Sequence, residues 1–299
     1  MIVGGEATAA LTIRHGAQEA VLLPDLGGRV GLYRSGGTDW LHPLPEGGPP
    51  AEALRRGGCY PLVPYSNRIR GGRFTWRGRE VRLPAWPMTV PHSLHGVGWQ
   101  RAWEVAERAA DRAVLRLEHI GDERWPWRFT ATQTVRLDDS GLTLALRMES
   151  RDAEAQPAGL GFHPFFPRRG RAEIAFRAER HWLAGPDRVP TGWEPVPPDL
   201  DFHAGRPVPE GLDDGFGGWD GTALIRWPGE GLSLSVRAEA PLGHLILFVP
   251  PERPFFCFEP VSHATDAVNL DFPPAVTGLR ELAPGAVLEA TMELRPGHL

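Results

Sequence analysis

The chain has 299 residues, of which 41% are hydrophobic, and its formal net charge is −5. This length is enough for a full core, in one large domain or two ordinary ones, and the negative charge gives no electrostatic basis for binding nucleic acid or an anionic membrane. All 32 basic residues are arginine, which excludes chemistry that needs a lysine amine, such as a Schiff base or a Walker-type phosphate loop.

The two cysteines, Cys59 and Cys257, make neither a disulfide framework nor a zinc cluster. Both lie in apolar, strand-like runs, which is typical of small core residues. The first residues, MIVGGEATAALTIRHG, lack a basic start followed by an apolar stretch, so we expect no signal peptide. The longest apolar run, near LILFVPP, is too short to cross a bilayer. We therefore expect a soluble, cytoplasmic protein.

Short runs of alternating polarity, separated by glycine and proline, predict strands along the whole chain. In chain order they are a hairpin over 73–83, two strands around a polar turn within 103–120, a hairpin over 129–150 with its turn at 138–141, a hairpin over 222–240, and strands over 244–250, 255–261 and 287–296. Residues 101–110 come nearest to a helical pattern, and a strand is favoured there as well.

No linker divides the chain. The proline-rich stretch 184–212 carries Trp193 and Phe202, which indicates an ordered excursion rather than a domain boundary. About twenty short antiparallel strands in one unit predict an all-β fold, a large sandwich or barrel. We expect a single domain over residues 1–299.

Five segments combine polar side chains with rigid, turn-rich surroundings. They are VPYSNRIRGGRF with Asn67 and Arg68, PHSLHGVGW with His92, His95 and Trp99, GLGFHPFF with His163, GLDDGF with Asp213 and Asp214, and FFCFEPVSHATDAVN with Glu259. Each also has a structural interpretation, such as a salt-bridged loop, a core histidine or a plain turn. The carboxylate of Glu259 ends an apolar strand, where it is costly unless it is paired or used.

The histidines do not suggest a metal site. His92 and His95 are three residues apart, and in a strand this spacing points them to opposite faces. Two carboxylates would allow glycosidase chemistry, and eleven tryptophans would allow sugar stacking of the kind that a lectin uses. Pro164 fixes its own φ and pushes His163 toward an extended conformation, so this imidazole is held rigidly among aromatic neighbours.

Five strings carry a family resemblance. NRIRGGRF, HSLHGVGW, GFHPFF, LDDGF and FEPVSHATDAVN occur in this order and span most of the chain. Together they resemble the aldose 1-epimerase (galactose mutarotase) family, whose fold is a large antiparallel β-sandwich, the galactose-mutarotase-like supersandwich. The resemblance therefore implies the same fold class as the strand pattern.

The resemblance also implies roles for matching residues. His163 resembles the general acid and Glu259 the general base. The substrate-binding residues that it implies are Asn67, Arg68, His95 and Asp213, with Asp214 as the alternative to Asp213. It implies a small-molecule aldose as partner, no cofactor and no metal, and a chain that acts as a monomer or homodimer.

One departure from the family concerns the sugar. Some members have a glutamine near a tyrosine–threonine pair before the last motif, whereas this chain reads GHLILFVPPERP there and has no such glutamine. The hydroxyl pattern that it recognises can therefore differ from that of galactose, and the sugar stays open.

The implied reaction is mutarotation. A base removes the proton of the C1 hydroxyl and an acid protonates the ring oxygen; the ring opens, the C1–C2 bond rotates, and closure gives the other anomer. With Glu259 ionised and His163 protonated, we expect their attraction to raise the pKa of His163 and lower that of Glu259. Two alternatives remain: an inert sugar-binding or sensing protein on the same fold, and a hexose-phosphate 1-epimerase in which Arg68, Arg70 and Arg73 meet a phosphate.

Overall fold

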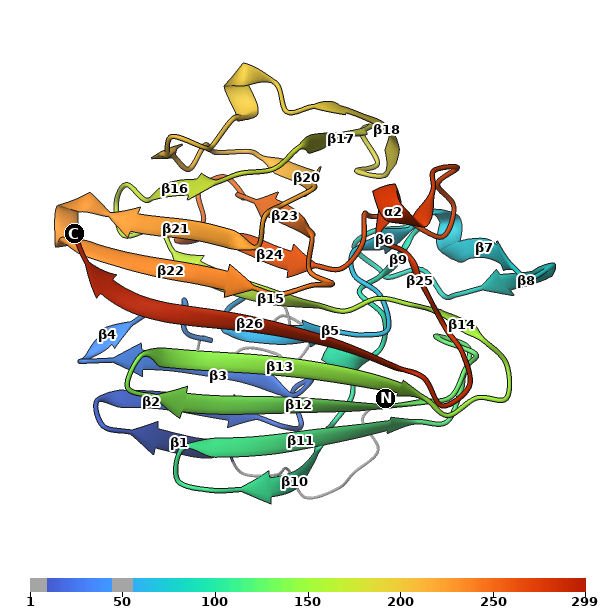
Figure 1. Cartoon of the computed structure of the whole chain (residues 1–299), viewed down its shortest axis with the longest axis horizontal. Coiled ribbons are helices and arrows are strands. Elements are labelled where there is room, and N and C mark those ends of the chain that lie inside the picture. Colours follow the sequence, from blue (N-terminus) through green and yellow to red (C-terminus); the bar gives the residue numbers. More distant parts are fainter. Residues whose placement is uncertain (1–9, 45–55) are drawn as a thin grey trace.

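Strands dominate the computed structural model, which describes residues 10–44 and 56–299. They form two large antiparallel sheets, and Figure 1 shows the second sheet lying in front of the first. In spatial order the first sheet contains β1 (Leu11–His15), β2 (Gln18–Leu23), β3 (Arg29–Ser35), β5 (Cys59–Leu62), β15 (Gly161–Pro167), β24 (Phe255–Val261), β23 (His244–Phe248), β20 (Asp213–Gly217), β17 (Arg180–Ala184) and β18 (Pro190–Pro195), with β4 (Thr38–Asp39) paired to β3.

The second sheet is built mainly from the predicted hairpins. In spatial order it contains β10 (Glu104–Arg108), β11 (Arg112–His119), β12 (Phe129–Asp138), β13 (Gly141–Ser150), β26 (Val287–His298), β22 (Leu232–Ala238), β21 (Thr222–Trp227), β16 (Glu173–Phe176) and β19 (Arg206–Pro207). The expected all-β antiparallel sandwich is confirmed, as is the strand preferred over a helix within 101–110. The proline-rich stretch 184–212 is ordered and contributes β18 and β19 to the two sheets. The single domain over 1–299 stays a prediction.

The remaining elements are short and connect or cover the sheets. They are the strand pairs β6 (Arg68–Ile69) with β9 (Ser93–Leu94), β7 (Arg73–Trp76) with β8 (Arg79–Arg82) and β14 (Gln156–Ala158) with β25 (Arg280–Leu282), the 3₁₀ turns η1 (Arg70–Gly72), η2 (Gly98–Gln100), η3 (Pro198–Leu200) and η4 (Pro228–Glu230), and the helix α2 (Pro274–Thr277). Within the described ranges no helix is long and apolar enough to cross a membrane.

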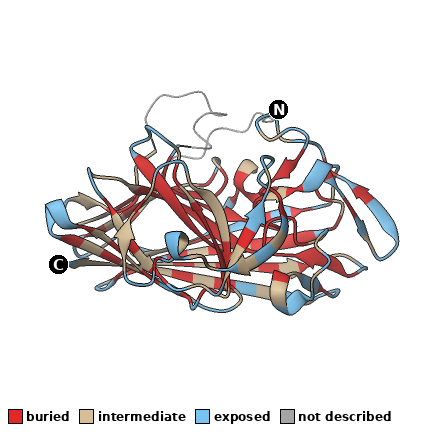
Figure 2. Cartoon of the chain, turned by 90° about the horizontal axis from the view of Figure 1, so that it is seen from above, coloured by how far each residue is buried: buried red, intermediate tan, exposed pale blue. Residues whose placement is uncertain are grey.

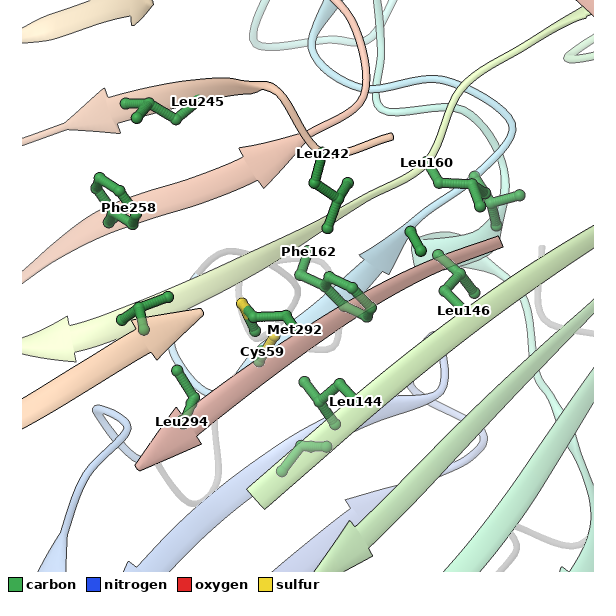
Figure 3. Packing of buried hydrophobic residues seen from close by; sticks show 14 of the residues in the cluster. Cys59, Leu144, Leu146, Leu160, Phe162, Leu242, Leu245, Phe258, Met292 and Leu294 are labelled. Atoms are coloured by element: carbon green, nitrogen blue, oxygen red, sulfur yellow. The ribbon is translucent and has the colours of Figure 1, made fainter. Parts of the chain in front are cut away.

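The main core lies between the two sheets. Buried residues line the strands, while exposed residues gather in loops and at hairpin ends (Figure 2). Figure 3 shows side chains from both inner faces: Cys59, Phe162, Leu245 and Phe258 from the first sheet, and Leu144, Leu146, Met292 and Leu294 from the second. Because successive side chains of a strand alternate between faces, the neighbours of Phe162 and Phe258 on β15 and β24 point to the opposite face of the first sheet. His163 and Glu259 are two of these neighbours.

We expect Phe162→Ala to lower the free energy of unfolding by about 3–5 kcal/mol, because it leaves a cavity between the sheets. Phe162 is completely buried, whereas Ile120 is 74% exposed and provides the control. Ile120→Ala should change the free energy of unfolding by no more than about 0.5 kcal/mol. Urea denaturation followed by tryptophan fluorescence measures both, and equal losses in the two variants would contradict this assignment of the core.

Candidate active site

The central feature of the first sheet is a pair of titratable side chains on adjacent strands. β15 and β24 pair antiparallel with Gly161 opposite Val261 and Phe165 opposite Cys257, which sets His163 opposite Glu259. Residues opposite each other in such a pair share a face of the sheet. The Nε2 atom of His163 lies 3.2 Å from Oε1 of Glu259. Two distant motifs of the sequence thus form one acid–base pair.

The pair lies in a cleft of about 560 Å³, counted with its open mouth. This cleft is on the face of the first sheet turned away from the core described above. All six site residues expected from the sequence line it: Asn67, Arg68, His95, His163, Asp213 and Glu259. The structure therefore brings them together, and their chemical roles stay predictions.

Burial dominates the electrostatics of Glu259. Its side chain is 3% exposed, and this desolvation raises its pKa well above the ordinary range for a carboxyl group. The nearby charge of Asp213 raises the pKa further, and the guanidinium of Arg68 opposes both effects. The expectation that pairing with His163 lowers the pKa of Glu259 is therefore wrong, because burial is the largest influence on this carboxyl group and raises its pKa.

Arg68 is fixed by two neighbours. Its Nη2 atom lies 3.6 Å from Oδ2 of Asp213, and its Nη1 donates to Oδ1 of Asn67 at 3.1 Å. The backbone N–H of Arg68 donates to the same Asn67 oxygen at 2.9 Å. A planar guanidinium held in this way presents its donors in a fixed direction.

His95 is oriented by the backbone of the opposite loop. Its Nδ1 accepts a hydrogen bond of 3.0 Å from the backbone N–H of Asn67, so the neutral ring carries its proton on Nε2. His95 and Asn67 both have left-handed backbones, with φ of 59° and 56°. Such conformations are uncommon outside glycine and gather at functional sites. The following Gly96 also has a positive φ, and a Cβ there would lie 2.5 Å from the carbonyl oxygen of Val63, which explains the histidine–glycine sequence.

Aromatic rings hold His163 in place. Tyr60, which is opposite His163 on β5, stacks on the imidazole at a centroid distance of 4.4 Å, and Phe165 stacks on it at 4.7 Å. Beyond Tyr60 lies the fully buried Arg29, with its guanidinium 4.5 Å from the centre of the tyrosine ring. Sequence reasoning missed Tyr60 and Arg29. Only the pairing of β5 with β15 brings Tyr60 beside His163, and Arg29 comes from β3, the strand on the other side of β5.

Three other residues singled out in the sequence have structural contacts. His92 accepts at Nδ1 from the backbone N–H of Gly71. His263 accepts at Nε2 from the backbone N–H of Ser66 and hydrogen-bonds through Nδ1 to a carbonyl oxygen. Trp99 is fully buried, stacks on Tyr60 at a centroid distance of 5.4 Å and lines the cleft beside it.

The two neighbouring aspartates point to different places. Asp213 lines the cleft and faces Arg68, whereas Asp214 does not line the cleft and lies 3.7 Å from Nε2 of His181. Both aspartates also line an adjacent cavity. Of the two alternatives left by the sequence, the geometry thus favours Asp213 as the residue near a substrate.

The segment without the family glutamine forms an apolar wall. Ile246 and Phe248, from GHLILFVPPERP, both line the cleft. On this side the cleft offers hydrocarbon rather than a hydrogen-bonding amide.

Within the described parts of the chain, one group of side chains could hold a metal ion. Ligand atoms of His163, Cys257 and Glu259 all lie within 4.8 Å of one another. Cys257 is fully buried, as expected for a core residue, but it lies on the cleft face of β24 beside the acid–base pair.

Comparisons with known proteins agree with this geometry. The family model described as Aldose 1-epimerase matches residues 9–295. The uncharacterized protein YphB of Escherichia coli (strain K12) is 32% identical over 293 residues, which cover 95% of this chain and 97% of YphB. The galactose mutarotase of Mus musculus is 27% identical over 137 residues, or 42% of this chain and 39% of the mouse protein.

A solved structure gives the same result. The crystal structure of a putative aldose 1-epimerase from Escherichia coli K12 superposes with a TM-score of 0.88 at 30% identity, covering 97% of this chain and 99% of that chain. With the ordered motifs, the two-sheet fold and these near full-length matches in agreement, the chain belongs to the aldose 1-epimerase family.

Proposed function

We propose that the protein catalyses the interconversion of the α and β anomers of a free aldose. The observation that supports this most directly is the contact of 3.2 Å between His163 Nε2 and Glu259 Oε1 in a cleft with polar side chains. A reaction at an acetal carbon needs a base and an acid on two oxygens bonded to the same carbon. An acid and a base that serve such oxygens must lie close together, as these two do.

In the proposed reaction Glu259 removes the proton from the C1 hydroxyl while His163 donates a proton to the ring oxygen. The C1–ring oxygen bond breaks and a free aldehyde forms. Rotation about C1–C2 and closure on the other face of the aldehyde give the second anomer, with acid and base exchanged. These steps need no cofactor and no covalent intermediate. A carboxylate with a raised pKa is a stronger base than an ordinary one, which suits proton abstraction near neutral pH.

The other polar residues of the cleft bind and orient the sugar in this proposal. Arg68, held by Asn67 and Asp213, donates charge-assisted hydrogen bonds to hydroxyl or ring oxygens. His95 donates from Nε2, because its Nδ1 already accepts from the backbone. Oriented binding of this kind lowers the entropic cost of bringing the acetal to the acid–base pair.

The hexose-phosphate alternative receives less support. Arg70 lies 3.2 Å from Asp187, and Arg73 lies 3.7 Å from Glu80. Of the three arginines considered for a phosphate, only Arg68 lines the cleft. A panel of free and phosphorylated aldoses, each dissolved as one anomer and followed by polarimetry or NMR, tests both activities. Binding of a sugar without faster anomer exchange would favour the inert binding protein instead.

We expect Glu259→Gln to slow anomer exchange by at least about a hundredfold, because the amide cannot accept the hydroxyl proton. Glu281→Gln is the matched control, since Glu281 is an exposed partner of Arg77 on another part of the chain. Polarimetry gives the rates, and circular dichroism checks the fold. A well-folded Glu259→Gln variant with a near-normal rate would remove this residue from the mechanism.

His163→Asn should separate binding from catalysis. Asparagine keeps a donor of similar reach but does not deliver a proton, so the rate should fall by about a hundred- to ten-thousandfold. Calorimetric affinity for an aldose that the parent converts should weaken by only about 1–3 kcal/mol, one hydrogen bond's worth. If affinity changes while exchange by the parent is no faster than in buffer, His163 is a binding residue and the proposal is wrong.

The pH dependence of the rate should reflect the raised pKa of Glu259. Catalysis needs the ionised carboxylate, so the rate should fall as pH decreases through the pKa of Glu259, which burial raises well above that of an ordinary glutamate. Asp213→Asn removes a charge that raises the pKa of Glu259, so the acidic limb of the pH–rate profile should move to lower pH. Asp214→Asn, outside the cleft, is the control. A limb that stays in place in Asp213→Asn would show that Glu259 does not set it.

A further inference from the structure

Cys257 lies beside the acid–base pair for a simple geometric reason. It precedes Glu259 by two residues on β24, so the two side chains share a face of the strand. His163, opposite Glu259 on β15, points to the same face. The other cysteine, Cys59, is also fully buried but packs among the core residues between the sheets (Figure 3). The two cysteines thus belong to different sides of the first sheet.

The three side chains offer one nitrogen, one sulfur and one oxygen ligand. These atoms all lie within 4.8 Å of one another, and His163 Nε2 is 3.2 Å from Glu259 Oε1. Within residues 10–44 and 56–299 no other group of three histidine, cysteine or acidic ligands is so arranged. Imidazole, thiolate and carboxylate are the ligands that Zn²⁺ takes in proteins, and three protein ligands leave a fourth position open.

The charge balance of the group favours a divalent cation. A thiolate and a carboxylate together carry two negative charges, which Zn²⁺ neutralises in a site that is almost completely buried. The Oε2 atom of Glu259 has no hydrogen-bond partner among the described residues. A buried carboxylate oxygen without a hydrogen bond destabilises the fold, and coordination of the carboxylate to a cation offsets this destabilisation.

We propose that His163, Cys257 and Glu259 form a site for Zn²⁺ and that the ion inhibits the enzyme when it binds there. Binding replaces the S–H bond of Cys257 with a zinc–sulfur bond and releases the proton to solvent. The ring nitrogen of His163 that coordinates the ion and the carboxyl group of Glu259 likewise release any proton they hold. The ion then occupies the lone pairs that Glu259 and His163 use to accept and transfer protons. Inhibition rests on the proposed function, whereas metal binding itself does not.

Titration with Co²⁺ of protein first treated with EDTA tests the binding without reference to activity. Thiolate ligation gives a near-ultraviolet charge-transfer band that oxygen and nitrogen ligands do not give. We expect this band in the parent and in Cys59→Ala, in which Cys257 is the sole cysteine of the chain. We expect no such band in Cys257→Ala, and Zn²⁺ should abolish it in the parent by displacing Co²⁺.

Anomer exchange measured against Zn²⁺ concentration tests the inhibition. Relative to its own metal-free rate, Cys257→Ala should need at least about tenfold more Zn²⁺ for half inhibition, since loss of even an indirect contact to a metal ligand costs about that much affinity. Cys59→Ala should match the parent, and EDTA should restore full activity.

Each outcome separates the metal site from the enzymatic proposal. A cobalt–thiolate band in a parent that does not accelerate exchange would leave the metal site standing and overturn the proposed function. Exchange by the parent with no band in either the parent or Cys59→Ala would overturn the metal site alone. Equal sensitivity to Zn²⁺ in the parent and a folded Cys257→Ala would show that Cys257 is not a ligand.

Discussion

The antiparallel register between β15 and β24 is the constraint on which the cleft depends. Side chains alternate with a period of two, so a shift by one residue would turn His163 into the core and Phe162 into the cleft. Gly161 helps to fix the close approach of the strands, because a Cβ there would lie 2.8 Å from a methyl carbon of Val261. Both strands are buried on both faces, apart from the half-buried Pro167. Packing of the core on one face of these strands therefore determines which side chains point into the cleft on the other face.

The same burial sets the protonation behaviour of Glu259. A carboxylate in water is a weak base. Burial raises the pKa of Glu259, which makes its carboxylate a stronger base but also makes the ionised form less stable. Arg68 limits that cost, and Asp213 in turn holds Arg68 while adding its own opposing charge. The surroundings of Glu259 thus set both its strength as a base and the fraction of molecules in which it is ionised.

The sequence predicts the local features of this molecule better than the long-range ones. Alternation over 142–150 is sufficient to predict β13, because the period of a strand is a property of neighbouring residues. The motifs around His163 and Glu259 indicate residues for one site. The stacking of Tyr60 on His163 depends on which distant strands pair, and no local pattern contains that information. The raised pKa of Glu259 follows from burial in the folded chain, and reasoning from the charge of its partner alone predicts the wrong sign.

The strand order has a consequence for how the protein is made. β24 lies between β15 and β23 and comes late in the chain, so His163 leaves the ribosome well before Glu259 does. Until β24 is inserted, β15 and β23 present open edges that invite pairing with other chains. Contacts between such distant segments form slowly, because the intervening loop must be closed first. Insertion of β24 therefore completes the sheet and brings Glu259 beside His163 in one step. The same step covers the open edges of β15 and β23, at which the chain could otherwise aggregate.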